Sequence, residues 1–148
     1  MLALKVPPPI IFAASGFCMF ALSDFQMQLT PWRLTICLVI WLLAMAIALT
    51  SIWCFFKCKT SVDPHHPDKS SVLIATGIFN FSRNPMYLSL LLILIGWAFL
   101  LSSFWTFVPI IAFILYITQF QIKPEEEILA KKFNDDYHRY CSSVRRWF

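Results

Sequence analysis

A short polar sequence at the start of a long apolar segment carries the residues best suited to bind a ligand. It reads Arg83-Asn84-Pro85, and the apolar run that follows extends to Ile122. Asn is a favoured N-cap residue, and Pro is favoured at the first helical position because it has no N–H to leave unpaired. We therefore predict a helix that begins at Pro85 with Asn84 as its cap. Free backbone N–H groups there, beside the Arg83 guanidinium, would suit an anion such as a carboxylate.

A second polar group follows the apolar run directly and consists of Glu125, Glu126 and Glu127. Beyond it, apolar residues recur at intervals of three or four positions: Leu129, Phe133, Tyr137, Tyr140 and Val144. This spacing predicts an amphipathic helix over Pro124–Val144. A helix of this kind would lie along the membrane surface or fold back on the preceding span, where it could carry the acidic residues close to Arg83.

The composition excludes a soluble globular domain. Of the 148 residues, 59% are hydrophobic and 14% are charged, and the mean hydropathy is +0.68, which indicates an integral membrane protein. The five cysteines are odd in number and mostly occupy apolar runs, so we expect buried thiols and no disulfide framework. With three glycines, the chain lacks a glycine-rich phosphate or dinucleotide loop, which argues against a soluble Rossmann-type enzyme.

One polar loop invites a metal-site interpretation. His65 and His66 lie between prolines and follow Cys54 and Cys58, and both residue types are zinc ligands. The prolines and the irregular spacing favour a solvated loop, so we predict no metal site. A role for His65 or His66 in covering a pocket or as a general base stays open.

Four apolar stretches predict an all-α integral membrane protein. Two of them are Pro7–Leu22 and Leu34–Phe56, and the others are the two halves of Pro85–Ile122. As one helix that last run would be about 57 Å long, nearly twice the hydrocarbon thickness, so it must turn. Leu101-Ser102-Ser103 is the expected turn. We therefore predict about four transmembrane helices, with the C-terminal amphipathic helix folded over the cytoplasmic mouth.

The placement of the basic residues predicts the orientation. With four spans, 11 of the 12 Lys and Arg residues lie on one side and only Arg33 on the other, so both termini should be cytoplasmic. We expect one membrane domain over 1–148, with two spans and a loop in 1–71 and the hairpin and tail in 72–148. A cleaved signal peptide over 1–22 is the alternative, but three remaining spans would leave a basic segment outside.

Two segments together resemble one enzyme family. Gly77–Phe79 with Arg83–Tyr87 is similar to the pattern G-[PV]-[YF]-x3-R-[HN]-P-x-Y, and Glu125–Tyr140 is similar to E-E-x2-L-x3-F-x3-Y-x2-Y. Both patterns are typical of the isoprenylcysteine carboxyl methyltransferase and phospholipid methyltransferase family. The resemblance covers about Val72–Val144, roughly half the chain.

The resemblance implies a membrane methyltransferase that uses S-adenosylmethionine, bound at the cytoplasmic mouth between the hairpin and the folded-back tail. It implies a lipid or lipid-modified acceptor, of the isoprenylcysteine carboxylate or the phospholipid amine type, that enters from the bilayer. We expect membrane lipids and no nucleic acid among its partners, and the short chain suggests a bacterial inner-membrane protein with a cytoplasmic active site. A non-catalytic membrane scaffold that retains the hairpin is the alternative.

The family's site residues carry over by position. Arg83 and Glu126 are the candidate catalytic residues, and the candidate cofactor-binding residues are Gly77, Phe79, Arg83, Asn84, Pro85, Tyr87, Glu125, Glu126 and Tyr137. A guanidinium suits a carboxylate, an acidic side chain suits ribose hydroxyls or an ammonium group, and aromatic faces suit adenine or a sulfonium.

Three positions depart from the family pattern. Ser71 and Asn84 stand where His is common in the isoprenylcysteine enzymes, and Asn134 stands where Gly is expected after the tail phenylalanine. These departures weaken the case for an isoprenylcysteine substrate without weakening the prediction of a methyltransferase.

Overall fold

The computed structural model describes residue 4 and residues 6–58 and 72–148, and these residues form helices with no strand among them. Ser71, His65 and His66 lie outside the described residues, so the expectations for them stay predictions. The elements in chain order are the helices α1 (Pro8–Ala21) and α2 (Pro31–Lys57), the 3₁₀ turn η2 (Gly77–Asn80), helix α3 (Pro85–Leu101), the 3₁₀ turn η3 (Phe104–Thr106), helix α4 (Phe107–Ile117), the π-helix η4 (Thr118–Ile122) and helix α5 (Lys123–Ser143).

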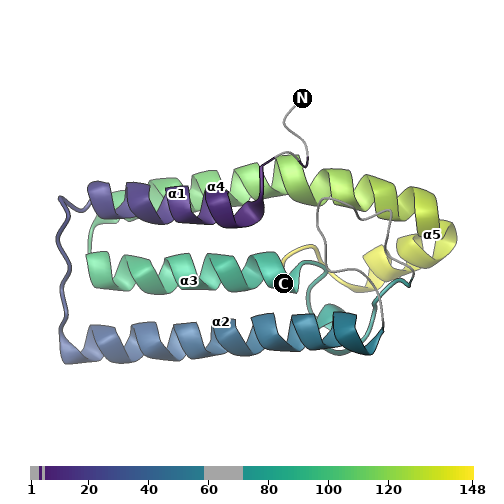
Figure 1. The fold of residues 1–148 in the computed structure, drawn as a ribbon, viewed down its shortest axis with the longest axis horizontal. Coiled ribbons are helices and arrows are strands. Elements are labelled where there is room, and N and C mark those ends of the chain that lie inside the picture. Colours follow the sequence, from purple (N-terminus) through teal and green to yellow (C-terminus); the bar gives the residue numbers. More distant parts are fainter. Residues whose placement is uncertain (1–3, 5, 59–71) are drawn as a thin grey trace.

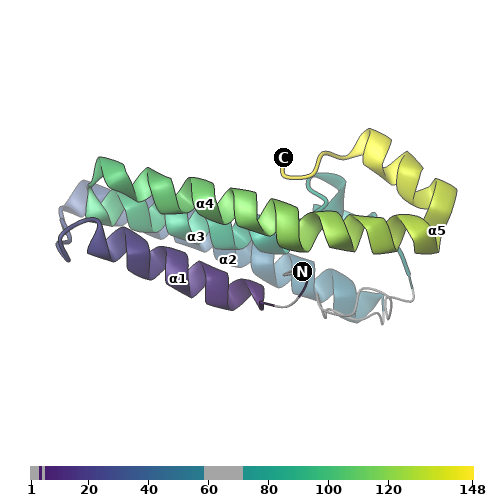
Figure 2. The same cartoon turned by 90° about the horizontal axis from the view of Figure 1, so that it is seen from above.

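Helices α1, α2, α3 and α4 lie side by side along the long axis of the molecule, and α5 turns back at one end (Figures 1 and 2). Helix α3 contacts α1, α2 and α4, so it is the central element of the bundle. The start of α1, the end of α2 and the start of α3 lie at the same end as α5. The segments that carry the candidate site residues are therefore gathered at one end of the bundle.

Helix α3 begins and ends where the sequence predicts. Its first residue is Pro85, and it ends at Leu101 because Ser102 adopts a left-handed conformation with φ of 53°. The expected side-chain cap is wrong, however. Asn84 occupies the N-cap position, but its side chain makes no capping bond to a described residue, and its Nδ2 donates to the Arg146 carbonyl at 2.9 Å.

A close approach between α2 and α3 explains how these helices pack. A Cβ atom at Gly96 would lie only 2.6 Å from Nε1 of Trp41, so this position has room for no side chain. The indole Nε1–H of Trp41 donates to the Ile93 carbonyl at 3.1 Å, which satisfies a polar group on an otherwise apolar surface.

The predicted amphipathic helix over Pro124–Val144 does not start as a separate element, because the helical run extends from Phe104 through Pro124 to Ser143. The π-helix η4 joins α4 to α5 without a break. The fold-back occurs at Asn134, whose φ of 44° and ψ of −118° interrupt the helix. Glycine adopts such a conformation without strain, which explains why glycine is the residue expected at this position.

The predicted apolar face of the tail persists across this kink. Tyr137, Tyr140 and Val144 are buried with Ile74 and Phe79, and Leu129 and Phe133 pack against the same cluster. The tail therefore covers the end of the bundle, as expected.

Two described helices are long and apolar enough to cross a membrane. They are Pro31–Lys57, with a mean hydropathy of 2.5, and Phe104–Ser143, with 1.6, whose apolar part ends at Ile122. Helices α1 and α3 are apolar but shorter, at 14 and 17 residues. The count of four spans and the orientation stay predictions.

Candidate functional site

A cavity of about 440 Å³ lies between the start of α3, the end of α2 and helix α5. This volume is within the range of about 300–1,000 Å³ that is usual for small-molecule sites. Its wall includes eight of the nine candidate cofactor-binding residues: Phe79, Arg83, Asn84, Pro85, Tyr87, Glu125, Glu126 and Tyr137. The rest of the wall is mostly apolar and includes Pro8, Ala48, Phe55, Ile74 and Leu90.

Gly77 stands apart from this cavity wall. Its φ of 64° is in the left-handed region, and a Cβ atom there would lie 3.1 Å from Sγ of Cys54. Gly77 therefore shapes the turn that brings Phe79 to the cavity, where its ring packs edge-on against Phe55 at 5.6 Å between centroids.

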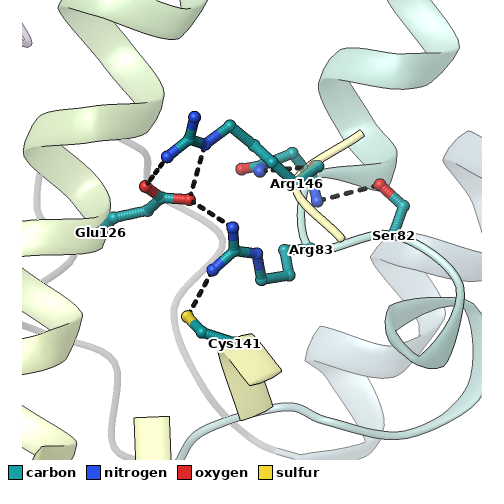
Figure 3. Close-up of polar contacts among 6 residues, drawn as sticks. Ser82, Arg83, Glu126, Cys141 and Arg146 are labelled. Carbon is teal, nitrogen blue, oxygen red and sulfur yellow. Dashed lines mark hydrogen bonds and ion pairs between the residues drawn. The ribbon is translucent and has the colours of Figure 1, made fainter. Parts of the chain in front are cut away.

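The central polar feature of the site is the Glu126 carboxylate between two guanidinium groups (Figure 3). Arg146 donates from Nε to Oε1 at 3.0 Å and from Nη2 to Oε2 at 2.8 Å, which is a bidentate pair. Arg83 approaches Oε1 through Nη2 at 3.3 Å. Folding therefore brings the first polar group of the sequence against the second, as predicted.

Arg83 makes contacts through its side chain and its backbone, but one of its guanidinium donors has no partner among the described residues. Its Nη1 contacts Sγ of Cys141, and its backbone N–H donates to the Arg145 carbonyl at 3.0 Å. Its Nε atom is buried and has no hydrogen-bond partner within the described part of the chain. A buried guanidinium donor without an acceptor is costly, so this edge of Arg83 is suited to an anionic ligand group.

The three neighbouring acids have three different environments. Glu126 is in the ion pairs described above, Glu127 is exposed, and Glu125 accepts a hydrogen bond from the Tyr87 hydroxyl. Glu125 lies beyond the apolar segment that ends at Ile122. Burial raises the pKa of its carboxyl to about 8, and the charge of Glu126 adds to this, while the bond from Tyr87 opposes it.

Two tyrosines of α5 close the cavity on its aromatic side. The hydroxyl of Tyr140 donates to the Phe79 carbonyl at 2.7 Å, and the rings of Tyr137 and Tyr140 lie 6.4 Å apart. Burial raises the pKa of both phenols above the usual value, so both are neutral at physiological pH.

The structure adds residues to the site that the sequence reasoning did not single out. Arg146 and Cys141 touch Glu126 and Arg83, and Pro8 and Pro9 form part of the cavity wall. By sequence, Arg146 is one of the basic residues near the C-terminus and has no predicted partner. No spacing rule could have assigned it a partner, because the contact depends on the fold-back at Asn134.

The described residues contain no group of three or more His, Cys, Asp or Glu side chains that could hold a metal ion. His138 is exposed, and the five cysteines form no disulfide. The acidic and basic side chains among the described residues of the cavity wall are those of Arg83, Glu125 and Glu126.

Two helices long and apolar enough to cross a bilayer indicate membrane association, and a cavity lined by polar and apolar side chains lies at one end of the bundle. The chain belongs to the phospholipid methyltransferase family, whose model matches residues 32–136. It is therefore a member of a methyltransferase family, and the match includes every candidate site residue except Tyr137. Residues 137–148, which include Arg146, lie outside the matched range.

The chain is also similar to a protein of Haemophilus influenzae that is described only as an uncharacterized protein. The two are 53% identical over 62 residues, which is 98% of that protein and 42% of this chain. No solved structure matches the chain.

Proposed function

We propose that this protein is a membrane methyltransferase that transfers a methyl group from S-adenosylmethionine to a lipid or lipid-like acceptor. The observation that carries the proposal is the buried Nε of Arg83, which has no hydrogen-bond partner among the described residues and belongs to a side chain of the cavity wall that also includes Glu125. S-adenosylmethionine has both a carboxylate and an ammonium group, so it offers a partner for each of these side chains. The family to which the chain belongs supports the same reaction.

The residues of the cavity fit the separate parts of this cofactor. Arg83 would hold the carboxylate through Nε, and Glu125 would accept from the ammonium group or from a ribose hydroxyl. The rings of Phe79 and Tyr137 offer faces to the adenine or to the sulfonium. When bound, the cofactor supplies a methyl group on an electrophilic sulfur.

The chain's own contribution to the transfer is positioning and the exclusion of water. Methyl transfer is an in-line displacement, so most of the rate enhancement comes from holding the donor and the acceptor in line. The apolar wall formed by Ala48, Phe55 and Leu90 suits the hydrocarbon part of a lipid acceptor. An acceptor that must lose a proton would meet Glu125, the cavity carboxyl that is in no ion pair with a described residue.

We propose a bacterial inner-membrane location with the cavity and both termini facing the cytoplasm. The support is the distribution of charge, since 11 of the 12 Lys and Arg residues belong to the segments gathered at the cavity end under the four-span prediction. Arg33 belongs to the opposite end, where its Nη1 donates to the Phe99 carbonyl at 3.2 Å.

Calorimetry with S-adenosylhomocysteine tests the binding part of the proposal. We expect the full chain, purified in detergent, to bind one equivalent and to gain thermal stability on binding. Arg83→Ala should remove binding, whereas Arg139→Ala, which removes an exposed arginine of α5 paired with Asp136, should bind as the unmodified chain does. A folded unmodified chain that binds neither S-adenosylhomocysteine nor S-adenosylmethionine would contradict the proposal.

A further inference from the structure

The C-terminal segment 144–148 is fastened to the site at several points. The Arg83 N–H donates to the Arg145 carbonyl at 3.0 Å, and Nδ2 of Asn84 donates to the Arg146 carbonyl at 2.9 Å. Trp147 packs against the apolar core of the bundle. The segment therefore lies beside Arg83 and Asn84, the residues just before α3, and this brings the Arg146 side chain to Glu126 (Figure 3).

The two arginines do not share Glu126 equally. Arg146 occupies both carboxylate oxygens, at 3.0 and 2.8 Å, whereas Arg83 reaches one oxygen through Nη2 at 3.3 Å. Since a guanidinium and a carboxylate favour a two-bond pair, Glu126 without Arg146 would be free to turn fully onto Arg83. A two-bond pair through Nη2 and Nε would then cover the Arg83 edge that is unpartnered among the described residues.

We propose that Arg146 is a positioning residue that acts through Glu126. By occupying both oxygens of Glu126, it keeps Nε of Arg83 available to the carboxylate of a bound ligand. The inference rests on the proposed function, because it assigns that carboxylate to the amino-acid end of the cofactor. It gives the C-terminal segment, which lies outside the family match, a part in cofactor affinity.

The test compares the dissociation constants of S-adenosylhomocysteine for the full chain and its variants, measured by calorimetry in detergent. Arg146→Ala should raise the dissociation constant about 10- to 100-fold, as expected when hydrogen bonds to a charged group are lost. Arg146→Lys, whose ammonium cannot form the two-bond pair, should raise it by a smaller factor and covers the case in which Arg146→Ala does not fold. Arg139→Ala, which removes the same charge from the exposed face of α5, should stay within about twofold of the unmodified chain.

A double variant separates this role from a merely structural one. If Arg146 acts by keeping Glu126 off Arg83, then Glu126→Ala in the Arg146→Ala background removes the competing carboxylate and lowers the dissociation constant at least fivefold, a result that would also remove Glu126 from the candidate cofactor-binding residues. If Arg146 only stabilises the fold, the double variant binds no better than Arg146→Ala.

Binding of S-adenosylhomocysteine to the unmodified chain tests the proposed function, and binding to the variants tests the role of Arg146. An unmodified chain that does not bind S-adenosylhomocysteine overturns both. An unmodified chain that binds, together with an Arg146→Ala variant that binds equally well or a double variant with no recovery, overturns only the role of Arg146.

Discussion

Glu125→Gln should change how the stability of the protein depends on pH. Burial raises the pKa of this carboxyl from 4.5 to about 8. At about 1.36 kcal/mol per pKa unit, this difference changes the free energy of unfolding by at most about 5 kcal/mol across the pH range. The folded chain keeps a proton that the unfolded chain releases above pH 4.5. This contribution is therefore fully present below pH 4.5 and is lost as the pH rises through 8. Between pH 6 and 8 the expected loss is about 2 kcal/mol, or about 4–8 °C in the unfolding temperature.

Thermal unfolding in detergent, followed by the fluorescence of the six tryptophans, measures this effect. The amide of Glu125→Gln stays neutral and still accepts the hydrogen bond from Tyr87. The unfolding temperature of the variant should therefore rise relative to that of the unmodified chain as the pH increases from 6 to 8. Glu127→Gln is the matched control, because Glu127 lies two residues from Glu125, is exposed, and should show no such rise in stability. An unfolding-temperature difference between Glu125→Gln and the unmodified chain that is equal at pH 6 and pH 8 would show that the pKa of Glu125 is not raised in the folded protein.

Three further substitutions test the local geometry through the unfolding temperature. Gly77→Ala should destabilise by about 1–2 kcal/mol, because φ is 64° and the new Cβ would lie 3.1 Å from Sγ of Cys54; an unchanged unfolding temperature would argue against this turn. Asn134→Gly should stabilise by up to about 1 kcal/mol at the kink, and a loss of stability would mean that the kink is not formed as described. Tyr140→Phe should cost about 1–2 kcal/mol by leaving the Phe79 carbonyl without its buried donor, and a cost near zero would show that this bond is not made.

The elements that the sequence predicts best are those set by local rules. Pro85 starts α3 because its ring fixes a helical φ and it needs no hydrogen-bond acceptor, and the run that follows is too long to cross a bilayer once. The turn at Ser102 follows from that length limit. The approach of Glu126 to Arg83 was also predictable, since the amphipathic pattern of the tail requires a surface to cover.

The features that sequence reasoning missed depend on contacts between distant segments. Asn84 is an ordinary capping residue by type, but its side chain bonds to the Arg146 carbonyl because the C-terminal segment passes beside it. The π-helix over Thr118–Ile122 leaves no mark in the hydropathy pattern, so the tail was expected to begin as a separate helix. Asn134 differs from the family's glycine, but only the structure shows that the chain reverses there.

The transfer of a labelled methyl group shows directly whether this protein is a lipid methyltransferase. Vesicles of bacterial membrane phospholipids that contain the full chain would be incubated with methyl-labelled S-adenosylmethionine, and the lipid classes would then be separated. We predict that label accumulates in a lipid fraction with the unmodified chain and stays at background with Arg83→Ala. An unmodified chain that binds the cofactor but labels no lipid fraction would contradict the account and would favour the non-catalytic scaffold.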